Sequence, residues 1–157
     1  MNDRGTSAVL GALRQAFPDG RLVTDIEERY LGDWLMRAGP GAQPIALLRP
    51  RGTADVASAL AICNAHRTPV VPQGGRTGLA GGATPVAGSL LISMELMAGI
   101  EAVDAVSQTM TVQAGVPLQM IQEAADMAGL MFPLDIGARG SCQIGRASCR
   151  ERVYGLV

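Results

Sequence analysis

The sequence predicts a small α+β or α/β domain in which helices pack on a sheet. Helical segments with apolar periodicity alternate with short apolar strands, in the order strand, helix, strand, glycine-rich loop, strand, strand pair, helix. Of the 157 residues, 48% are hydrophobic and 17% are charged, which is typical of a globular chain. Aromatic residues make up only 3%, so we expect a core of aliphatic side chains.

The first predicted helix begins at a Thr6 or Ser7 cap and stops before Pro18. Three apolar residues recur on one face of this helix: Leu10, Leu13 and Phe17. Asp19-Gly20 is typical of a turn, because glycine tolerates the backbone angles that turns require. Residues 26–35 mix polar and apolar positions and contain the only Trp, so they predict no regular element.

A buried strand is predicted at 45–49, closed by Pro50. Thr53 is expected to cap the next helix, with Asp55 in its first turn, where a negative charge suits the helix dipole. The expected inner face of this helix consists of Val56, Leu60 and Cys63. Further strands are predicted at 68–72 and 88–94, on either side of the glycine-rich loop.

The last part of the chain predicts two strands, 100–104 and 109–113, joined by a polar turn. A third helix follows, with Pro117 in its first position and Gly129 just past its end. Its expected buried stripe contains Leu118, Ile121, Ala125 and Ala128.

Composition and charge exclude some partners. The formal net charge is −1, there is no lysine, and aromatic residues are scarce, so the chain lacks both the charge and the stacking surface that nucleic acid requires. No apolar run is long enough for a signal peptide or a membrane span, so we expect a cytoplasmic protein. The three cysteines, Cys63, Cys142 and Cys149, are then expected to be reduced.

The stretch "GGRTGLAGG" at 74–82 contains five glycines in nine residues. It cannot be a Walker loop, because the chain has no lysine, and it lacks the G-x-G-x-x-G spacing of a dinucleotide-binding turn. The bare G-x-x-G at 75–78 matches a KH loop only weakly, because no basic surface accompanies it.

Two interpretations of this stretch remain. In the first, successive backbone N–H groups form a nest for an anion, to which Thr77 adds a hydroxyl and Arg76 a charge. In the second, the stretch is a flexible surface loop. No paired carboxylates, histidine cluster or nucleophile–base pair is present, so the sequence predicts no catalytic residue and no metal ligand.

Several stretches together resemble one known family. They are "VPQGGRTGLAGGATP", "GTADVASALAICNAHRTPVVP", "AVDAVSQTMTVQAGVPLQMIQEAADMAGLMFPLD" and "GARGSCQIG". Over roughly 31–145 the chain resembles FAD-linked oxidases and dehydrogenases of the vanillyl-alcohol-oxidase type, in the branch of D-lactate, glycolate and D-2-hydroxyglutarate dehydrogenases. The resemblance implies an α+β fold, the first part of a PCMH-type FAD-binding domain, with FAD held between two small subdomains.

The resemblance also implies cofactor-binding positions. In the family, backbone amides of the loop matching 73–78 wrap the FAD pyrophosphate, and the position of Gly82 lies close by. Arg76 stands where Asn is frequent. The residues implied for the pyrophosphate are Gln73, Gly74, Gly75, Arg76, Thr77, Gly78 and Gly82. Those implied for the ribityl and flavin end are Pro133, Ser141, Ile144 and Gly145, and Pro50 is implied on the adenine side.

Other residues are given structural interpretations. His66 is expected to cap the end of its helix, and Cys142 to be a packed thiol. Trp34 is expected to be buried in the core. Asp135 has two alternative roles: it contacts ribityl hydroxyls, or it caps the turn at Gly137.

The family pattern stops after "GSCQIG", where an Arg-rich segment follows. We therefore divide the chain into an N-terminal helix and the segment after it (1–40), a partial FAD domain (41–145) and a non-native tail (146–157), since "IGRASCRERV" resembles a translated sequencing adapter. The implied parent enzyme transfers a hydride from a D-2-hydroxy acid to flavin N5, and the chain alone is expected to be inactive. The alternative is a non-catalytic module that binds a phosphate-bearing ligand through the glycine loop.

Overall fold

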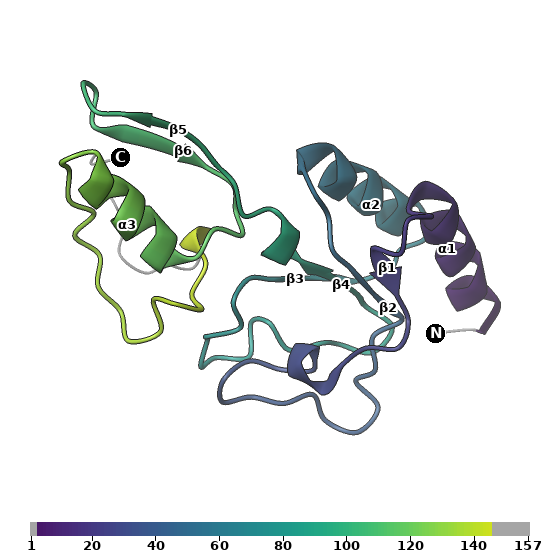
Figure 1. Ribbon diagram of the computed structural model, residues 1–157. Coiled ribbons are helices and arrows are strands. Elements are labelled where there is room, and N and C mark those ends of the chain that lie inside the picture. The colour runs from purple at the N-terminus through teal and green to yellow at the C-terminus, as the bar shows by residue number, and fades with distance from the viewer. Residues whose placement is uncertain (1–2, 146–157) are drawn as a thin grey trace.

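The computed structural model describes residues 3–145, which form an α+β fold with two groups of elements (Figure 1). The first group contains α1 (Asp3–Ala16), α2 (Thr53–Ala65) and a four-stranded sheet. The second contains the antiparallel pair β5 (Ile100–Asp104) and β6 (Thr109–Val112) together with α3 (Leu118–Met127). None of the helices in this part of the chain is long and apolar enough to cross a membrane.

The four-stranded sheet has the order β1-β2-β4-β3. Its strands are β1 (Leu22–Val23), β2 (Ala46–Leu48), β3 (Val70–Gln73) and β4 (Leu90–Ser93). β4 pairs in parallel with both β2 and β3, whereas β1 pairs antiparallel with β2. The carboxyl ends of β2, β3 and β4 therefore lie at the same edge, which is where ligands bind in parallel sheets.

Alternation along β2 and β4 gives the sheet two buried faces. One face carries Ala46, Leu48, Leu90 and Ile92, which pack with residues of α1 and α2. The opposite face carries Leu47 and Leu91, which pack with Val71 and Tyr30. Tyr30 belongs to the short helix η1 (Glu28–Tyr30). The second face of the sheet is therefore covered by a largely irregular segment, which sequence periodicity alone does not identify.

Most of the predicted elements are confirmed, with local corrections. α1 begins at Asp3, so neither Thr6 nor Ser7 is its cap. The N-cap of α2 is Gly52 and not Thr53. Leu60 is 45% exposed, because Ala59 and Cys63 occupy the buried face of α2 instead. The short strand β1 was not predicted, since two residues carry too little periodicity to detect.

Trp34 was wrongly predicted to lie in the core. Its side chain is 82% exposed, and Leu35 and Met36 beside it are exposed as well. The backbone of this segment contacts the glycine-rich stretch: the Trp34 N–H donates to the Gly78 carbonyl. Tyr30, at 1% exposed, takes the core position that we had expected for Trp34.

Two predicted local roles agree with the structure. His66 is the C-cap residue of α2, and Cys142 packs in the core of the second group with Leu118, Leu134 and Ile136. The Asp135 carboxylate is exposed and forms an ion pair with Arg139 at 3.8 Å. The tail at 146–157 lies outside the described residues, as does Cys149.

Burial predicts slow thiol chemistry. The Cys63 and Cys142 thiols are buried, and burial raises the pKa of Cys63. Since the thiolate is the nucleophile, we expect both thiols to react with a disulfide reagent at least about 100-fold more slowly in native protein than in urea. Mass mapping of the labelled peptides measures each site separately. Fast labelling of Cys63 or Cys142 in the absence of denaturant would contradict the packing described here.

Candidate functional site

The glycine loop, defined here as residues 74–82, follows β3 at the carboxyl edge of the parallel sheet. Pro50 follows β2 closely and so lies at the same edge, where it is buried. The sequence therefore brings two of its predicted cofactor-binding segments to one edge of the sheet. β4 lies between their two strands.

Backbone donors are concentrated in this loop. Within the described residues 3–145, no backbone N–H group of residues 75–80 donates a hydrogen bond. The only donor of this segment that is used within that range is the Arg76 guanidinium, which donates to the Gly74 carbonyl at 3.5 Å. Arg76 has φ of +53°, a left-handed conformation that is uncommon for a residue with a side chain. Left-handed residues next to right-handed ones turn successive N–H groups toward one point, which makes an anion-binding concavity.

Gln73 closes the base of the glycine loop. Its side chain is 1% exposed, and its Nε2 donates to the Tyr30 carbonyl at 2.8 Å and to the Ala83 carbonyl at 2.7 Å. The amide thus joins the start of the loop to its far end and to η1. The Nε2 of Gln73 therefore has an architectural role, and a cofactor contact of Gln73 stays a prediction.

A second loop, residues 137–143, packs against the first. A Cβ on Gly75 would lie 1.7 Å from the Ser141 carbonyl oxygen, and a Cβ on Gly74 would lie 3.2 Å from Gln143 Oε1. The smallness of Gly75 is therefore required by another part of the chain. Both predicted halves of the site, around Gly75 and around Ser141, meet at this contact.

Six buried side-chain polar atoms lack hydrogen-bond partners within the described part of the chain, and three of them belong to the two loops or to the base of the first: Gln73 Oε1, Thr77 Oγ1 and Gln143 Oε1. Unsatisfied polar atoms are expensive when buried and so indicate a ligand or water. The Thr77 hydroxyl can donate to a phosphate oxygen, and the Gln143 carbonyl can accept from a hydroxyl or an N–H group. These atoms and the unpaired amides fit a molecule that carries both a diphosphate and hydroxyl groups.

Arg76 stacks on Tyr30, with its guanidinium 4.6 Å from the ring centroid. Arg29 stacks on the same ring at 4.7 Å. The Tyr30 hydroxyl donates to Glu95 Oε1 at 2.7 Å, and burial, with a smaller contribution from Glu95, raises its pKa. Tyr30 therefore remains a neutral platform under the Arg76 side chain at physiological pH.

The remaining predicted site residues lie further out. Gly82 is exposed, and a Cβ there would meet nothing within 4 Å. Pro133 and Ile144 line a largely apolar groove of about 590 Å³ between the β5–β6 hairpin and α3. Gly145, next to Ile144, is exposed.

Three residues that sequence reasoning did not select contact or adjoin the glycine loop: Tyr30, Asp33 and Gln143.

The left-handed backbone at Arg76 allows the roles of amide and charge to be separated. Asn tolerates this conformation better than Arg, so Arg76→Asn relieves about 1 kcal/mol of backbone strain and loses a cation–π contact of about the same size. We expect the free energy of unfolding to change by less than about 1 kcal/mol. Because the amides remain, we expect FAD affinity to stay within about threefold in a fluorescence titration. A loss above thirtyfold would assign the phosphate contact to the guanidinium.

Among residues 3–145, no three His, Cys, Asp or Glu side chains gather closely enough to hold a metal ion. The two glycine-containing loops form a cradle whose unpaired amides, hydroxyl and side-chain carbonyls suit an anionic, hydroxyl-bearing molecule.

Comparison with solved structures defines the fold of the chain. The chain superposes on an alkyldihydroxyacetonephosphate synthase with a TM-score of 0.78 at 16% identity, covering 89% of this chain and 28% of that one. It superposes on p-cresol methylhydroxylase with a TM-score of 0.75 at 18% identity, covering 90% of this chain and 28% of that one. The fold is thus the PCMH-type FAD-binding fold that the sequence predicted.

A family model described as "FAD binding domain" matches residues 44–148. The chain belongs to this family of FAD-binding domains, and its cofactor is FAD. It is 43% identical over 136 residues to a D-2-hydroxyglutarate dehydrogenase of Xanthomonas citri pv. viticola, covering 85% of this chain and 28% of the relative. It is 41% identical over 138 residues to the mitochondrial D-2-hydroxyglutarate dehydrogenase of Bos taurus, covering 87% of this chain and 25% of the relative. The chain therefore spans about a quarter of the length of these relatives.

Proposed function

We propose that this chain is the FAD-binding portion of a flavin-dependent dehydrogenase acting on a D-2-hydroxy acid of the lactate, glycolate or 2-hydroxyglutarate type. The observation that carries the proposal is the glycine loop, whose free amides stand beside the orphaned hydroxyl of Thr77. The names of the relatives, which include D-2-hydroxyglutarate dehydrogenases and a D-lactate dehydrogenase, support the substrate class.

Each part of the site has a place in this proposal. Backbone amides of residues 75–80 hold the diphosphate, with Thr77 donating one further hydrogen bond. Ser141 and Gln143 in the second loop adjoin the ribityl and flavin end. Bound FAD supplies a hydride acceptor, while these residues bind and orient the cofactor. Pro133, Ile144 and Gly145 extend this end, the buried Pro50 lies on the adenine side, and the exposed Gly82 lies near the diphosphate.

We further propose that the chain alone does not turn over substrate. Among residues 3–145, no three His, Cys, Asp or Glu side chains gather closely enough to hold a metal ion, and the chain covers only 28% and 25% of the two relatives. The substrate-binding groups are then provided by the remainder of a full-length enzyme. A cytoplasmic location stays a prediction, and some relatives carry mitochondrial names.

Titration with FAD, ADP and riboflavin tests the proposal. We expect FAD to bind, ADP to bind more weakly, and D-lactate or D-2-hydroxyglutarate oxidation with a dye acceptor to be undetectable. Native-like turnover by the purified chain would contradict its proposed inactivity. If ADP binds as tightly as FAD, the non-catalytic phosphate-binding module becomes the better account. If neither nucleotide binds, the cradle is not a cofactor site in this chain.

A further inference from the structure

Asp33 lies in a short turn between Gly32 and Arg37, which form an isolated β-bridge. The Asp33 side chain is 6% exposed. Its Oδ1 accepts hydrogen bonds from the Leu35 N–H at 3.1 Å and the Met36 N–H at 2.7 Å. One carboxylate oxygen is therefore used to close the turn in which Asp33 itself lies.

The second oxygen of this carboxylate reaches the glycine loop. Asp33 Oδ2 accepts a hydrogen bond from the Gly81 N–H at 2.8 Å, across 48 positions of sequence. The Trp34 N–H donates to the Gly78 carbonyl at 3.1 Å. These two contacts hold the loop on both sides of Leu79 and Ala80. They leave the amides of 75–80 free and restrain the far half of the loop.

Asp33 is suited to this position because it is charged. Burial by itself raises the pKa of the carboxyl, but hydrogen bonds from the Met36, Gly81 and Leu35 amides outweigh that effect and lower the pKa. The group is thus ionised at neutral pH, and both of its oxygens accept hydrogen bonds. Hydrogen bonds to a charged acceptor are stronger than those between neutral groups.

We propose that Asp33 is a positioning residue for cofactor binding: its carboxylate clamps Gly81 and so holds the glycine loop in the shape that presents amides 75–80 to the FAD diphosphate. Asp33 does not touch the cofactor in this account. Its effect on affinity arises because a restrained loop loses less conformational entropy when the ligand binds. The cofactor part of the inference rests on the proposed function, whereas the clamping of the loop does not.

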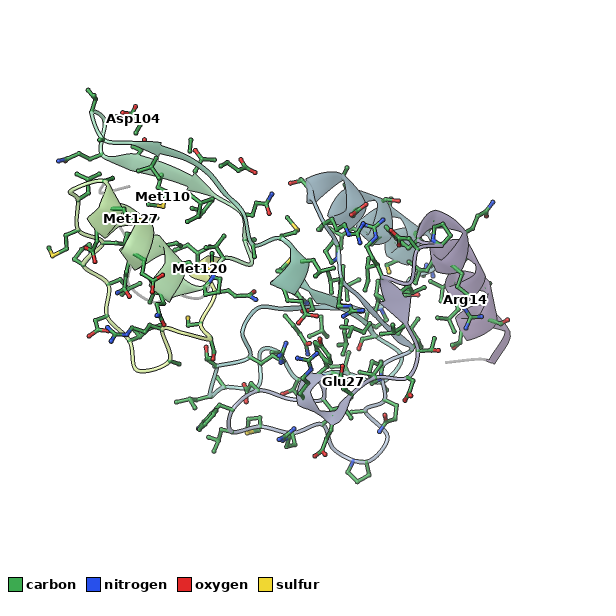
Figure 2. The ribbon with its side chains drawn as sticks, viewed as in Figure 1. Arg14, Glu27, Asp104, Met110, Met120 and Met127 are labelled. Atoms are coloured by element: carbon green, nitrogen blue, oxygen red, sulfur yellow. The ribbon has the colours of Figure 1, made fainter. Side chains whose placement is uncertain are left out.

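Asp33→Asn separates the two oxygens. Asparagine keeps an acceptor for Leu35 and Met36, but an NH₂ group replaces Oδ2 and faces the Gly81 N–H, so the turn is kept and the clamp is lost. The matched control is Asp104→Asn. Asp104 Oδ1 also accepts two turn amides, from Val106 at 2.9 Å and Ser107 at 3.1 Å. It lies at the end of the β5–β6 hairpin, away from the glycine loop (Figure 2).

The test measures hydrogen exchange and FAD affinity in the 157-residue chain and in both variants. We expect Asp33→Asn to speed exchange of the Gly81 amide at least about tenfold without FAD and to weaken FAD binding about tenfold, with the Asp104→Asn chain unchanged in both. Unchanged exchange at Gly81, or equal or tighter FAD binding by Asp33→Asn, would overturn the inference. Equal losses in the two variants would do the same, since they would indicate only general destabilisation.

The two readouts also keep this inference separate from the proposed function. If the unsubstituted chain binds no FAD but Gly81 exchange still depends on Asp33, the clamp exists and the proposed function fails. If FAD binds normally and exchange at Gly81 is insensitive to Asp33, the proposed function stands and the clamp is refuted.

Discussion

Gly75→Ala is expected to destabilise the protein by about 3 kcal/mol and to reduce FAD affinity more than tenfold. The new Cβ would lie 1.7 Å from the Ser141 carbonyl oxygen and 3.3 Å from the Cys142 Cα. Both neighbours are backbone atoms, so no side chain can rotate out of the way. The second loop must separate from the first, and the cradle opens. Chemical denaturation measures the first effect, and a fluorescence titration measures the second.

Gly82→Ala is the matched control for this substitution. A Cβ at Gly82 meets nothing within 4 Å, and the residue does not have a left-handed backbone. We expect its free energy of unfolding to change by less than about 0.5 kcal/mol. A loss of FAD affinity in this variant alone would therefore report a direct cofactor contact at Gly82. If Gly75→Ala proves as stable as Gly82→Ala, the packing of the two loops is not as described.

Gln73→Leu is expected to cost about 3 kcal/mol, which corresponds to a fall in Tm of roughly 6–12 °C. Leucine has a similar volume but no donor, so the Tyr30 and Ala83 carbonyls each lose the Gln73 hydrogen bond. Leaving buried polar groups unpaired is more costly than the average worth of a hydrogen bond. The base of the loop then loosens, and FAD affinity falls with stability.

Gln122→Leu provides the comparison. Gln122 is a half-buried residue of α3, away from the glycine loop. Its Nε2 donates one hydrogen bond, at 2.7 Å, to the Leu134 carbonyl. We expect a loss of about 1 kcal/mol and no change in FAD affinity. If Gln73→Leu were no worse than Gln122→Leu, the Gln73 amide would not be what holds the loop closed.

Acid should weaken the fold through its hydrogen-bonded carboxylates. Hydrogen bonds from the backbone or from neighbouring side chains lower the pKa of Asp19, Asp33 and Asp104 below the unfolded value of about 3.9. A group of this kind contributes stability that is complete above its unfolded pKa and is lost as the pH falls toward its folded pKa. Denaturation at several pH values should therefore show stability that declines below about pH 4, with a shallower decline in Asp33→Asn.

Periodicity predicted the elements that pack through regular faces. Leu13 in α1, Cys63 in α2 and Ile121 in α3 are all buried as expected, because apolar residues at helical spacing have only one way to leave water. The strand pair at 100–112 was also predictable, since a polar turn separates two segments of β-forming residues. These features depend on near neighbours along the chain.

The arrangement of the site depends on contacts between distant residues, and no local pattern contains it. The glycine run showed that something approaches the backbone closely, but the neighbour at Gly75 is the Ser141 carbonyl, 66 positions later. Likewise, Asp33 reaches Gly81, and Gln73 reaches Tyr30. Residues 33–36 form a short turn whose three apolar side chains are exposed. Nothing in the sequence of this turn indicates that it supports the glycine loop.

The central claim is that amides of the glycine loop bind the diphosphate of FAD, and amide NMR tests it most directly. Spectra of the ¹⁵N-labelled chain are recorded with FAD, with ADP and with riboflavin, which lacks a diphosphate. We predict that FAD and ADP both shift the amide signals of residues 75–80, while riboflavin leaves them in place. If riboflavin shifts these signals and ADP does not, or if FAD binds and leaves all of them unmoved, the diphosphate is held elsewhere and the account is wrong.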